Sequence, residues 1–120
     1  MHQENNSKLS LLKKYKLVSI VFIQDYLQLV FEGTRTNATI SGYVWPLVKT
    51  ESDTFSMGMA GYRDSLCELI GKRITNAINN DDDFLLMFSD GSEIRFSLRD
   101  EDQTGPEAIN LHVGDIIMVW

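Results

Sequence analysis

The stretch Gly61-Tyr62-Arg63-Asp64-Ser65-Leu66-Cys67-Glu68-Leu69-Ile70-Gly71 decides the fold, because its apolar residues recur with the period of a helix. The spacing i, i+4, i+7 and i+8 places four side chains on one face, namely Tyr62, Leu66, Leu69 and Ile70. Gly71 suits the left-handed residue that ends a helix, and two basic residues follow it at the negative end of the helix dipole. We therefore predict a central helix over about 62–70 whose apolar face is covered by the rest of the chain.

On both sides of this helix the sequence changes to the alternation and the β-branched and aromatic content of strands. The candidate strands span 17–24, 26–32, 37–45, 73–79, 84–88, 94–98, 109–113 and 116–120. Pro46 cannot donate to a sheet ladder, so it marks an edge or the end of pairing. The sequence thus predicts an α+β fold, in which the central helix packs on a mainly antiparallel sheet or sandwich of six to eight strands. Residues 1–120 make a single domain, with 1–7 as a loose N-terminal tail.

Three of the strands carry more detailed expectations. A hairpin joins 84–88 to 94–98 across Asp90-Gly91, whose glycine tolerates the positive φ of a tight turn, and every second residue from Ile94 faces the core. Strand 17–24 is rich in β-branched residues and is predicted to be covered on both faces. Segment 73–79 alternates two larger apolar residues with two smaller residues, which are Ile74 and Ile78 against Thr75 and Ala77.

The two halves of the chain resemble one another. Leu-Val-Phe-Glu-Gly at 29–33 and Leu-Met-Phe-Ser-Asp-Gly at 86–91 each end the second strand of a strand–turn–strand unit, and a third strand follows both. The offset is 57 or 58 residues. An old duplication would produce two related β units joined by the helix, but any two β meanders give a similar pattern, so both readings stay open.

The net charge of −6 is unevenly distributed. Residues 81–120 hold ten acidic residues against Arg95 and Arg99, a net charge of −8. Such a surface repels nucleic acid and anionic membranes, and it attracts a basic partner protein. The alternative is a set of solvated acidic turns. No apolar run approaches the roughly 20 residues of a membrane-spanning helix, so no membrane association is predicted.

The sequence contains no motif for catalysis, metal binding or a cofactor. Only His2 and His112 are available as a general base, and Cys67 is the single cysteine. We predict that Cys67 is a small core residue, while a Cys67–His112 pair is the enzymatic alternative. A lone cysteine fits the reducing cytoplasm. No catalytic residue, metal or cofactor is therefore predicted, and the protein is expected to be cytoplasmic.

Three groups of residues remain as a candidate binding surface: a tryptophan at a strand end, the first turn of the central helix, and the acidic loop before the penultimate strand. Their members are Trp45, Tyr62, Arg63, Asp64, Asp100, Glu101, Asp102 and Glu107. The structural alternative is an Arg63–Glu107 ion pair that ties this loop to the helix, with Trp45 packed alongside. The long connection 49–61 is expected to bury a small apolar cluster of Phe55, Met57 and Met59.

The same groups carry a family resemblance. Tyr43-Val44-Trp45-Pro46, the stretch 61–71, Phe88-Ser89-Asp90-Gly91, Ser97-Leu98 and Gly105-Pro106-Glu107-Ala108 resemble a family of small uncharacterised bacterial proteins over about residues 18–120. That resemblance implies a bacterial origin and one compact domain, and it brings no established activity. In size and acidity the chain is also similar to immunity proteins that neutralise bacterial toxins.

These observations favour a non-catalytic protein-binding domain, of the immunity or antitoxin kind, that neutralises a basic toxin. The alternative is a housekeeping protein with a small-molecule pocket near Trp45, Tyr62 and Arg63. The apolar C-terminal strand should be paired inside the sheet or covered by a partner, and a homo-oligomer through this strand is one way to cover it.

Overall fold

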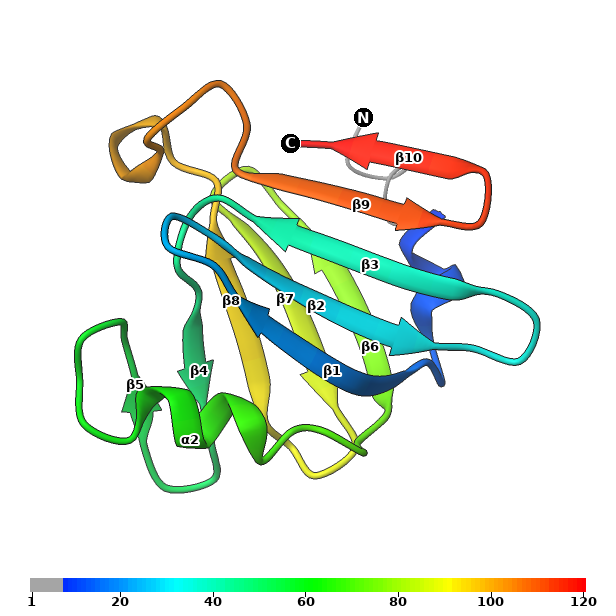
Figure 1. Cartoon of the computed structure of the whole chain (residues 1–120), viewed down its shortest axis with the longest axis horizontal. Helices are drawn as coiled ribbons and strands as arrows, with labels where there is room; N and C mark the ends of the chain where they lie inside the picture. Colours follow the sequence, from blue (N-terminus) through cyan, green and yellow to red (C-terminus); the bar gives the residue numbers. More distant parts are fainter. Residues whose placement is uncertain (1–7) are drawn as a thin grey trace.

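The fold was obtained as a computed structural model, which describes residues 8–120; the predicted tail, 1–7, lies outside this range. Two antiparallel five-stranded sheets enclose one apolar core (Figure 1). The first sheet has the order β1-β2-β3-β9-β10, and the second has the order β5-β4-β8-β7-β6. The strands are β1 (Lys16–Phe22), β2 (Leu27–Glu32), β3 (Asn37–Gly42), β4 (Leu47–Lys49), β5 (Thr54–Phe55), β6 (Ile74–Asn79), β7 (Asp83–Phe88), β8 (Glu93–Ser97), β9 (Ile109–Val113) and β10 (Ile116–Val119). One short α-helix, α2 (Tyr62–Cys67), and the 3₁₀ turns η1 (Ser10–Leu12) and η2 (Asp100–Asp102) complete the described chain.

The predicted fold class is confirmed, with ten strands in place of six to eight. The two additional strands are β4 and β5, which form a short hairpin that begins just before the predicted connection 49–61 and extends into it. The hairpin of β7 and β8 is confirmed in register, with Ile94 and Phe96 buried and Gly91 at φ 86°.

The central helix is shorter than predicted, and one residue of its apolar stripe is exposed. Tyr62, Leu66 and Leu69 are buried, but Ile70 is 43% exposed. The helix ends at Cys67, and the chain continues in tighter turns in which the Ile70 N–H donates to the Cys67 carbonyl. Because these turns change the angular spacing of the side chains, Ile70 leaves the stripe.

The sequence predictions are wrong about the buried faces of two strands, β1 and β6, and each of these strands contains a β-bulge. In β1 the register shifts between Leu17 and Ser19, and β1 lies at a sheet edge with Val18 and Val21 exposed, so it is not covered on both faces. In β6 the register shifts between Ile74 and Asn76. Since an extra residue reverses the alternation, the buried residues of β6 are Ile74, Ala77 and Asn79, whereas Ile78 is only partly buried.

The third strand also ends earlier than predicted, at Gly42, because residues 43–46 carry the chain from one sheet to the other. Pro46 lies in this crossing, where no sheet ladder requires its missing N–H. Met57 and Met59 are exposed and form no buried cluster with Phe55, which is partly buried against the core. Cys67 is exposed rather than a core residue, since the polar side of α2 carries it.

The order of elements repeats in the two halves. In the first half, β1-β2-β3 form most of the first sheet and the hairpin β4-β5 joins the second sheet. In the second half, β6-β7-β8 form most of the second sheet and the hairpin β9-β10 joins the first sheet. The two bulges are 57 residues apart, as are two positive-φ residues, Lys14 (φ 74°) and Gly71 (φ 95°). The buried residues Leu9 and Leu12 correspond to Leu66 and Leu69 at the same offset. The fold therefore contains the two related β units.

A symmetrical set of backbone hydrogen bonds joins β1 to β6, the adjacent edges of the two sheets. The Lys14 N–H donates to the Ile74 carbonyl and the Gly71 N–H donates to the Leu17 carbonyl, each at 2.7 Å. Leu17 and Ile74 donate in turn to the Lys72 and Tyr15 carbonyls, at 3.0 and 2.8 Å. Because this side of the sandwich is closed, the edges left open within residues 8–120 are β10 and β5 (Figure 1).

Gly42 in β3 faces Phe96 in β8, and a Cβ at Gly42 would overlap the ring. We expect Gly42→Ala to lower the free energy of unfolding by about 2 kcal/mol, since overpacking forces a buried ring or the backbone to move. Urea denaturation measures this loss. Gly105→Ala is the matched control, because a Cβ at Gly105 meets no atom within 4 Å. Equal stabilities of the two variants would contradict the packing of β3 against β8.

Candidate functional site

An acid-lined groove of about 620 Å³ lies between three segments. One wall is the turn of the β4–β5 hairpin, the second is α2 with the turns that follow it, and the third is the turn between β7 and β8. The carboxylates that line it are Glu51, Asp53, Asp64, Glu68 and Asp90. We call this depression the acidic groove.

The hairpin wall is held by a tight turn. The Thr50 N–H donates to the Asp53 carbonyl at 2.8 Å, and the Asp53 N–H donates to the Thr50 hydroxyl at 3.2 Å. Below the turn Val48 pairs with Phe55, and Val48 is fully buried. Glu51 and Asp53 are thereby fixed at the tip of the hairpin, with both residues exposed.

The helical wall is anchored by Tyr62. Its hydroxyl donates to the Pro46 carbonyl at 2.6 Å, within the segment that crosses between the sheets. Burial raises the pKa of Tyr62 well above its ordinary value, and the neighbouring Arg63 only partly offsets this, so the phenol stays protonated and remains a donor. With Leu66 and Leu69 buried below, α2 can only turn Asp64 and Glu68 outward, toward the groove.

The third wall is ordered by hydrogen bonds to Asp90. Its carboxylate accepts from the Ser92 N–H at 2.9 Å and from the Ser92 hydroxyl at 3.0 Å, and the Lys72 ammonium lies 3.5 Å away. Burial raises the pKa of the Asp90 carboxyl. The hydrogen bonds from Ser92 and the charge of Lys72 lower this pKa by more than burial raises it, so the net shift is downward. Asp90 is therefore ionised at neutral pH.

The groove is strongly negative. Lys72 is the one cationic residue among those lining it, and it is already paired with Asp90. Four carboxylates on two separate walls are left facing the same space. Within residues 8–120, no three His, Cys, Asp or Glu side chains converge to hold a metal ion. The arrangement instead suits a ligand whose positive charges are spread over several ångströms, such as basic side chains of a protein.

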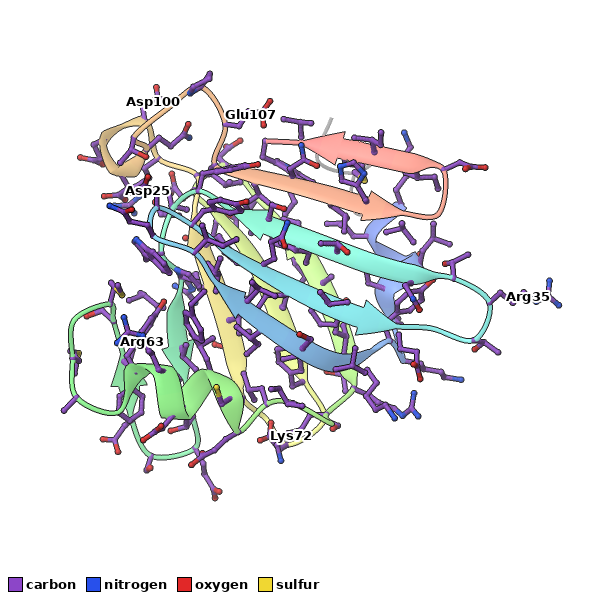
Figure 2. All side chains as sticks on the ribbon, viewed as in Figure 1. Asp25, Arg35, Arg63, Lys72, Asp100 and Glu107 are labelled. Atoms are coloured by element: carbon purple, nitrogen blue, oxygen red, sulfur yellow. The ribbon has the colours of Figure 1, made fainter. Side chains whose placement is uncertain are left out.

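The structure divides the residues predicted as one binding surface. Tyr62 is 2% exposed and structural, and Trp45 is partly buried against the core. Asp64 lines the acidic groove, and Arg63 lies beside it. Figure 2 places Arg63 next to α2, whereas Asp100 and Glu107 lie at the other end of the molecule.

The Arg63–Glu107 ion pair is absent from the described chain. The Arg63 guanidinium instead lies 5.8 Å from the centroid of the Phe22 ring. Glu107 lines a separate hollow of about 300 Å³ with Asp25 and Tyr43. The proposed link between the last loop and the helix is therefore wrong, since these two segments lie at opposite ends of the sandwich (Figure 2).

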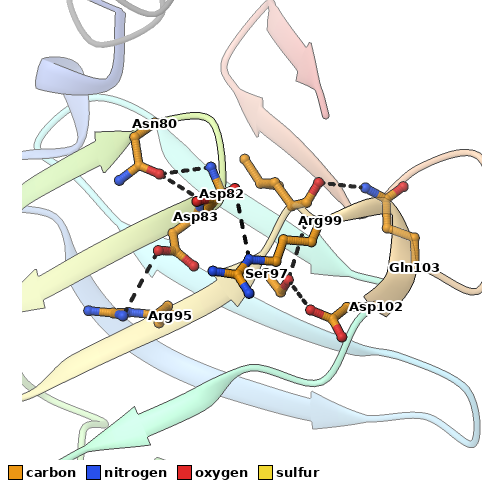
Figure 3. A network of polar contacts seen from close by, with 9 residues as sticks. Asn80, Asp82, Asp83, Arg95, Ser97, Arg99, Asp102 and Gln103 are labelled. Carbon is orange, nitrogen blue, oxygen red and sulfur yellow. Dashed lines mark hydrogen bonds and ion pairs between the residues drawn. The ribbon is translucent and has the colours of Figure 1, made fainter.

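Many acids of the C-terminal third are engaged in local turns, as Figure 3 shows. Asp102 accepts from the Ser97 hydroxyl at 2.6 Å. Asp82 and Asp83 lie 3.8 and 3.9 Å from Arg99 and Arg95. These contacts order the loops at one end of β7 and β8. The predicted acidic loop is thus partly a structural network, and the strongest concentration of unpaired carboxylates lies in the acidic groove.

A second, smaller hollow of about 370 Å³ adjoins the acidic groove. Its wall is the glycine-containing loop before α2 together with the first turn of the helix, and the lining includes Met57, Met59, Tyr62 and Arg63. Trp45, the third residue of the predicted small-molecule pocket, is not part of the lining.

Cys67 and His112 do not form a catalytic pair. Cys67 lies on α2, while His112 lies in β9, which β3, β2 and β1 separate from the helix (Figure 1). Among residues 8–120, no helix has the length and apolar character needed to cross a bilayer.

Sequence reasoning found Asp64 but missed the other four carboxylates of the groove. Glu68 was on the solvent side of the predicted helix, on the same wall as Asp64, so it could have been identified. Glu51 and Asp53 could not be identified, because the segment 47–55 is too short and polar for a recognisable hairpin pattern.

Comparison with models of known protein families, with curated proteins and with solved structures found no match to this chain. The resemblance to a bacterial family stays a prediction.

Tyr62→Phe removes one hydroxyl and leaves the Pro46 carbonyl without its donor. We expect a loss of about 1–2 kcal/mol in the free energy of unfolding, because a buried polar group then loses its hydrogen bond. Urea denaturation measures it. The control is Tyr26→Phe, since Tyr26 is partly exposed and its hydroxyl has no hydrogen bond within the described chain. If both variants matched the native protein, the hydroxyl would not anchor α2.

Proposed function

We propose that the protein is a non-catalytic binding protein whose acidic groove receives basic side chains of a partner protein. The observation that carries this proposal is the convergence of Glu51, Asp53, Asp64 and Glu68 from two walls on one depression, whose one lining cation, Lys72, is already paired with Asp90. A cleft lined by charges of one sign focuses the field and raises the association rate of an oppositely charged partner. Salt should weaken this effect.

The biological setting of the proposal is that of a bacterial immunity or antitoxin protein in the cytoplasm, with a basic toxin domain as the partner. The support for it is physical. The chain is acidic overall, with a net charge of −6. Four carboxylates of the groove have no paired cation, whereas Asp82 near η2 is paired with Arg99 and Asp102 accepts a hydrogen bond from Ser97. Nucleic acid and anionic membranes are unsuitable partners for such a surface.

The test reverses two groove charges. Glu51→Lys/Glu68→Lys alters both walls of the acidic groove, and Lys at position 68 remains favourable near the C-terminal end of α2. We expect this double variant to slow association with the partner by at least about tenfold at low salt, since steering depends on local potential. The measurement is affinity capture from the native host with tagged native and variant proteins, followed by association kinetics with the recovered protein.

The matched control is Asp100→Lys/Glu101→Lys, which makes the same change in net charge on η2, away from the groove. It should retain most of the native association rate. Equal losses in the two double variants would mean that only net charge matters, and recovery of no basic protein by the native bait would overturn the proposal.

A small-molecule binder is the second candidate, favoured by the hollow beside Arg63. Arg63 has a contact with Phe22 and no ion pair in the described chain, so its guanidinium is available to an anionic ligand. We expect Arg63→Ala to change the free energy of unfolding by no more than about 1 kcal/mol. A thermal-shift screen of anionic metabolites checks this candidate: a ligand that stabilises the native protein but not Arg63→Ala would favour it over the partner protein.

A further inference from the structure

We propose that β10 is the interface for a second copy of this chain, with the two β10 strands paired antiparallel about a two-fold axis. This inference is independent of the acidic groove, which lies on other segments of the fold. Its starting point is that β10 is one of the open edges of the sandwich and is apolar over its whole length, Ile116-Ile117-Met118-Val119. A free edge of this composition is a template for pairing with another strand.

The hydrogen-bonding pattern identifies which backbone groups are free. Trp120 and Ile109 exchange both backbone hydrogen bonds, with N–O distances of 2.9 and 3.4 Å. Bonded pairs alternate along an antiparallel ladder, so Met118 also bonds to β9. Ile117 and Val119 therefore direct their N–H and carbonyl groups away from β9. Neither has a hydrogen-bond partner on that side in the described chain.

The side chains of the same two residues are apolar and exposed. Ile117 is 60% exposed and Val119 is 50% exposed, whereas Met118 between them points into the core and is 9% exposed. Pairing two copies about Met118 would place Ile117 of each next to Val119 of the other. That arrangement makes new backbone hydrogen bonds and packs four aliphatic side chains against one another on the outer face of the extended sheet, which covers part of their exposed area.

The repeat within the fold provides an internal comparison. The open edge equivalent to β10 is β5, and the two hairpins superimpose in register, with Val48 paired to Phe55 where Leu111 pairs to Met118. An acidic residue precedes each edge, Asp53 at β5 and Asp115 at β10, so the two edges differ in length and not in flanking charge. A very short edge is one protection against pairing. The edge β5 has this protection with only two residues, whereas β10 has four.

Charge restricts where a second copy can bind. Two molecules that each carry a net charge of −6 repel one another at the groove and at the acidic loops. The strand β10 contains no charged residue, and the nearest carboxylate, that of Asp115, lies just before it. Antiparallel pairing about Met118 keeps the two Asp115 residues at opposite ends of the new ladder. A two-fold pairing also uses both free edges at once and leaves neither exposed.

The test compares equivalent positions on the two edges. Ile117→Lys places a charge on β10, and Thr54→Lys places the same charge at the corresponding position of β5. We expect the native protein and Thr54→Lys to dimerise with rising concentration in sedimentation experiments. Ile117→Lys should raise the dissociation constant of the dimer at least about tenfold. The variant loses apolar contacts across the interface and places two like charges near the two-fold axis. Circular dichroism confirms that both variants are folded.

Amide hydrogen exchange of the native protein provides a readout that needs no variant. In the dimer the amides of Ile117 and Val119 should become protected as concentration rises, while that of Met118 is protected throughout. A native protein that stays monomeric at its solubility limit would overturn the proposal. So would a dimer that Ile117→Lys leaves intact, or one that both variants weaken equally.

Discussion

The fold depends on backbone pairing between the two halves of the chain. Neither half completes a sheet alone, because each sheet needs the hairpin lent by the other half, through β3 with β9 in one sheet and β8 with β4 in the other. The hydrogen bonds between β1 and β6 then close one side of the sandwich. These pairings join residues far apart in sequence, so the core can form only when both halves are in place. The position of α2 and of every wall of the acidic groove follows from this exchange.

The sequence predicted those parts of the fold that depend on local pattern. The helix, the hairpin at Asp90-Gly91 and the sheet-dominated class were recognisable because each rests on a short period or a turn residue. The bulges in β1 and β6 were not recognisable, because one inserted residue reverses the faces of a strand without changing its composition. For this reason Ile78 was predicted on the wrong face. The exposure of Ile70 has a similar cause, since a helix that ends early breaks its own stripe.

The candidate site was less predictable than the fold, because it is built from three turns that only tertiary structure brings together. Asp64 was identified through its place in the helix. Asp90 was assigned to a turn, and its role as a wall of the groove required the contact between Lys72 and the β7–β8 turn. The charge along the sequence was also a poor guide to the site. The run 100–102 consists of three acids and was predicted as part of the binding surface, yet Asp102 accepts a hydrogen bond from Ser97. A charge run therefore locates loops, whereas the acids that share the groove come from separate segments.

The internal repeat separates what the scaffold requires from what each half adds to it. Equivalent positions before the first strand of each half keep the same buried leucines, since Leu9 and Leu12 match Leu66 and Leu69, and both first strands keep their bulge. The two lent hairpins have the same register, but their turns and edges differ in chemistry. One presents Glu51 and Asp53 to a groove, and the other ends in an uncharged aliphatic strand. The buried scaffold is thus the same in both halves, and the chemistry differs at the exposed turns and edges of the two hairpins, where packing constrains the sequence least.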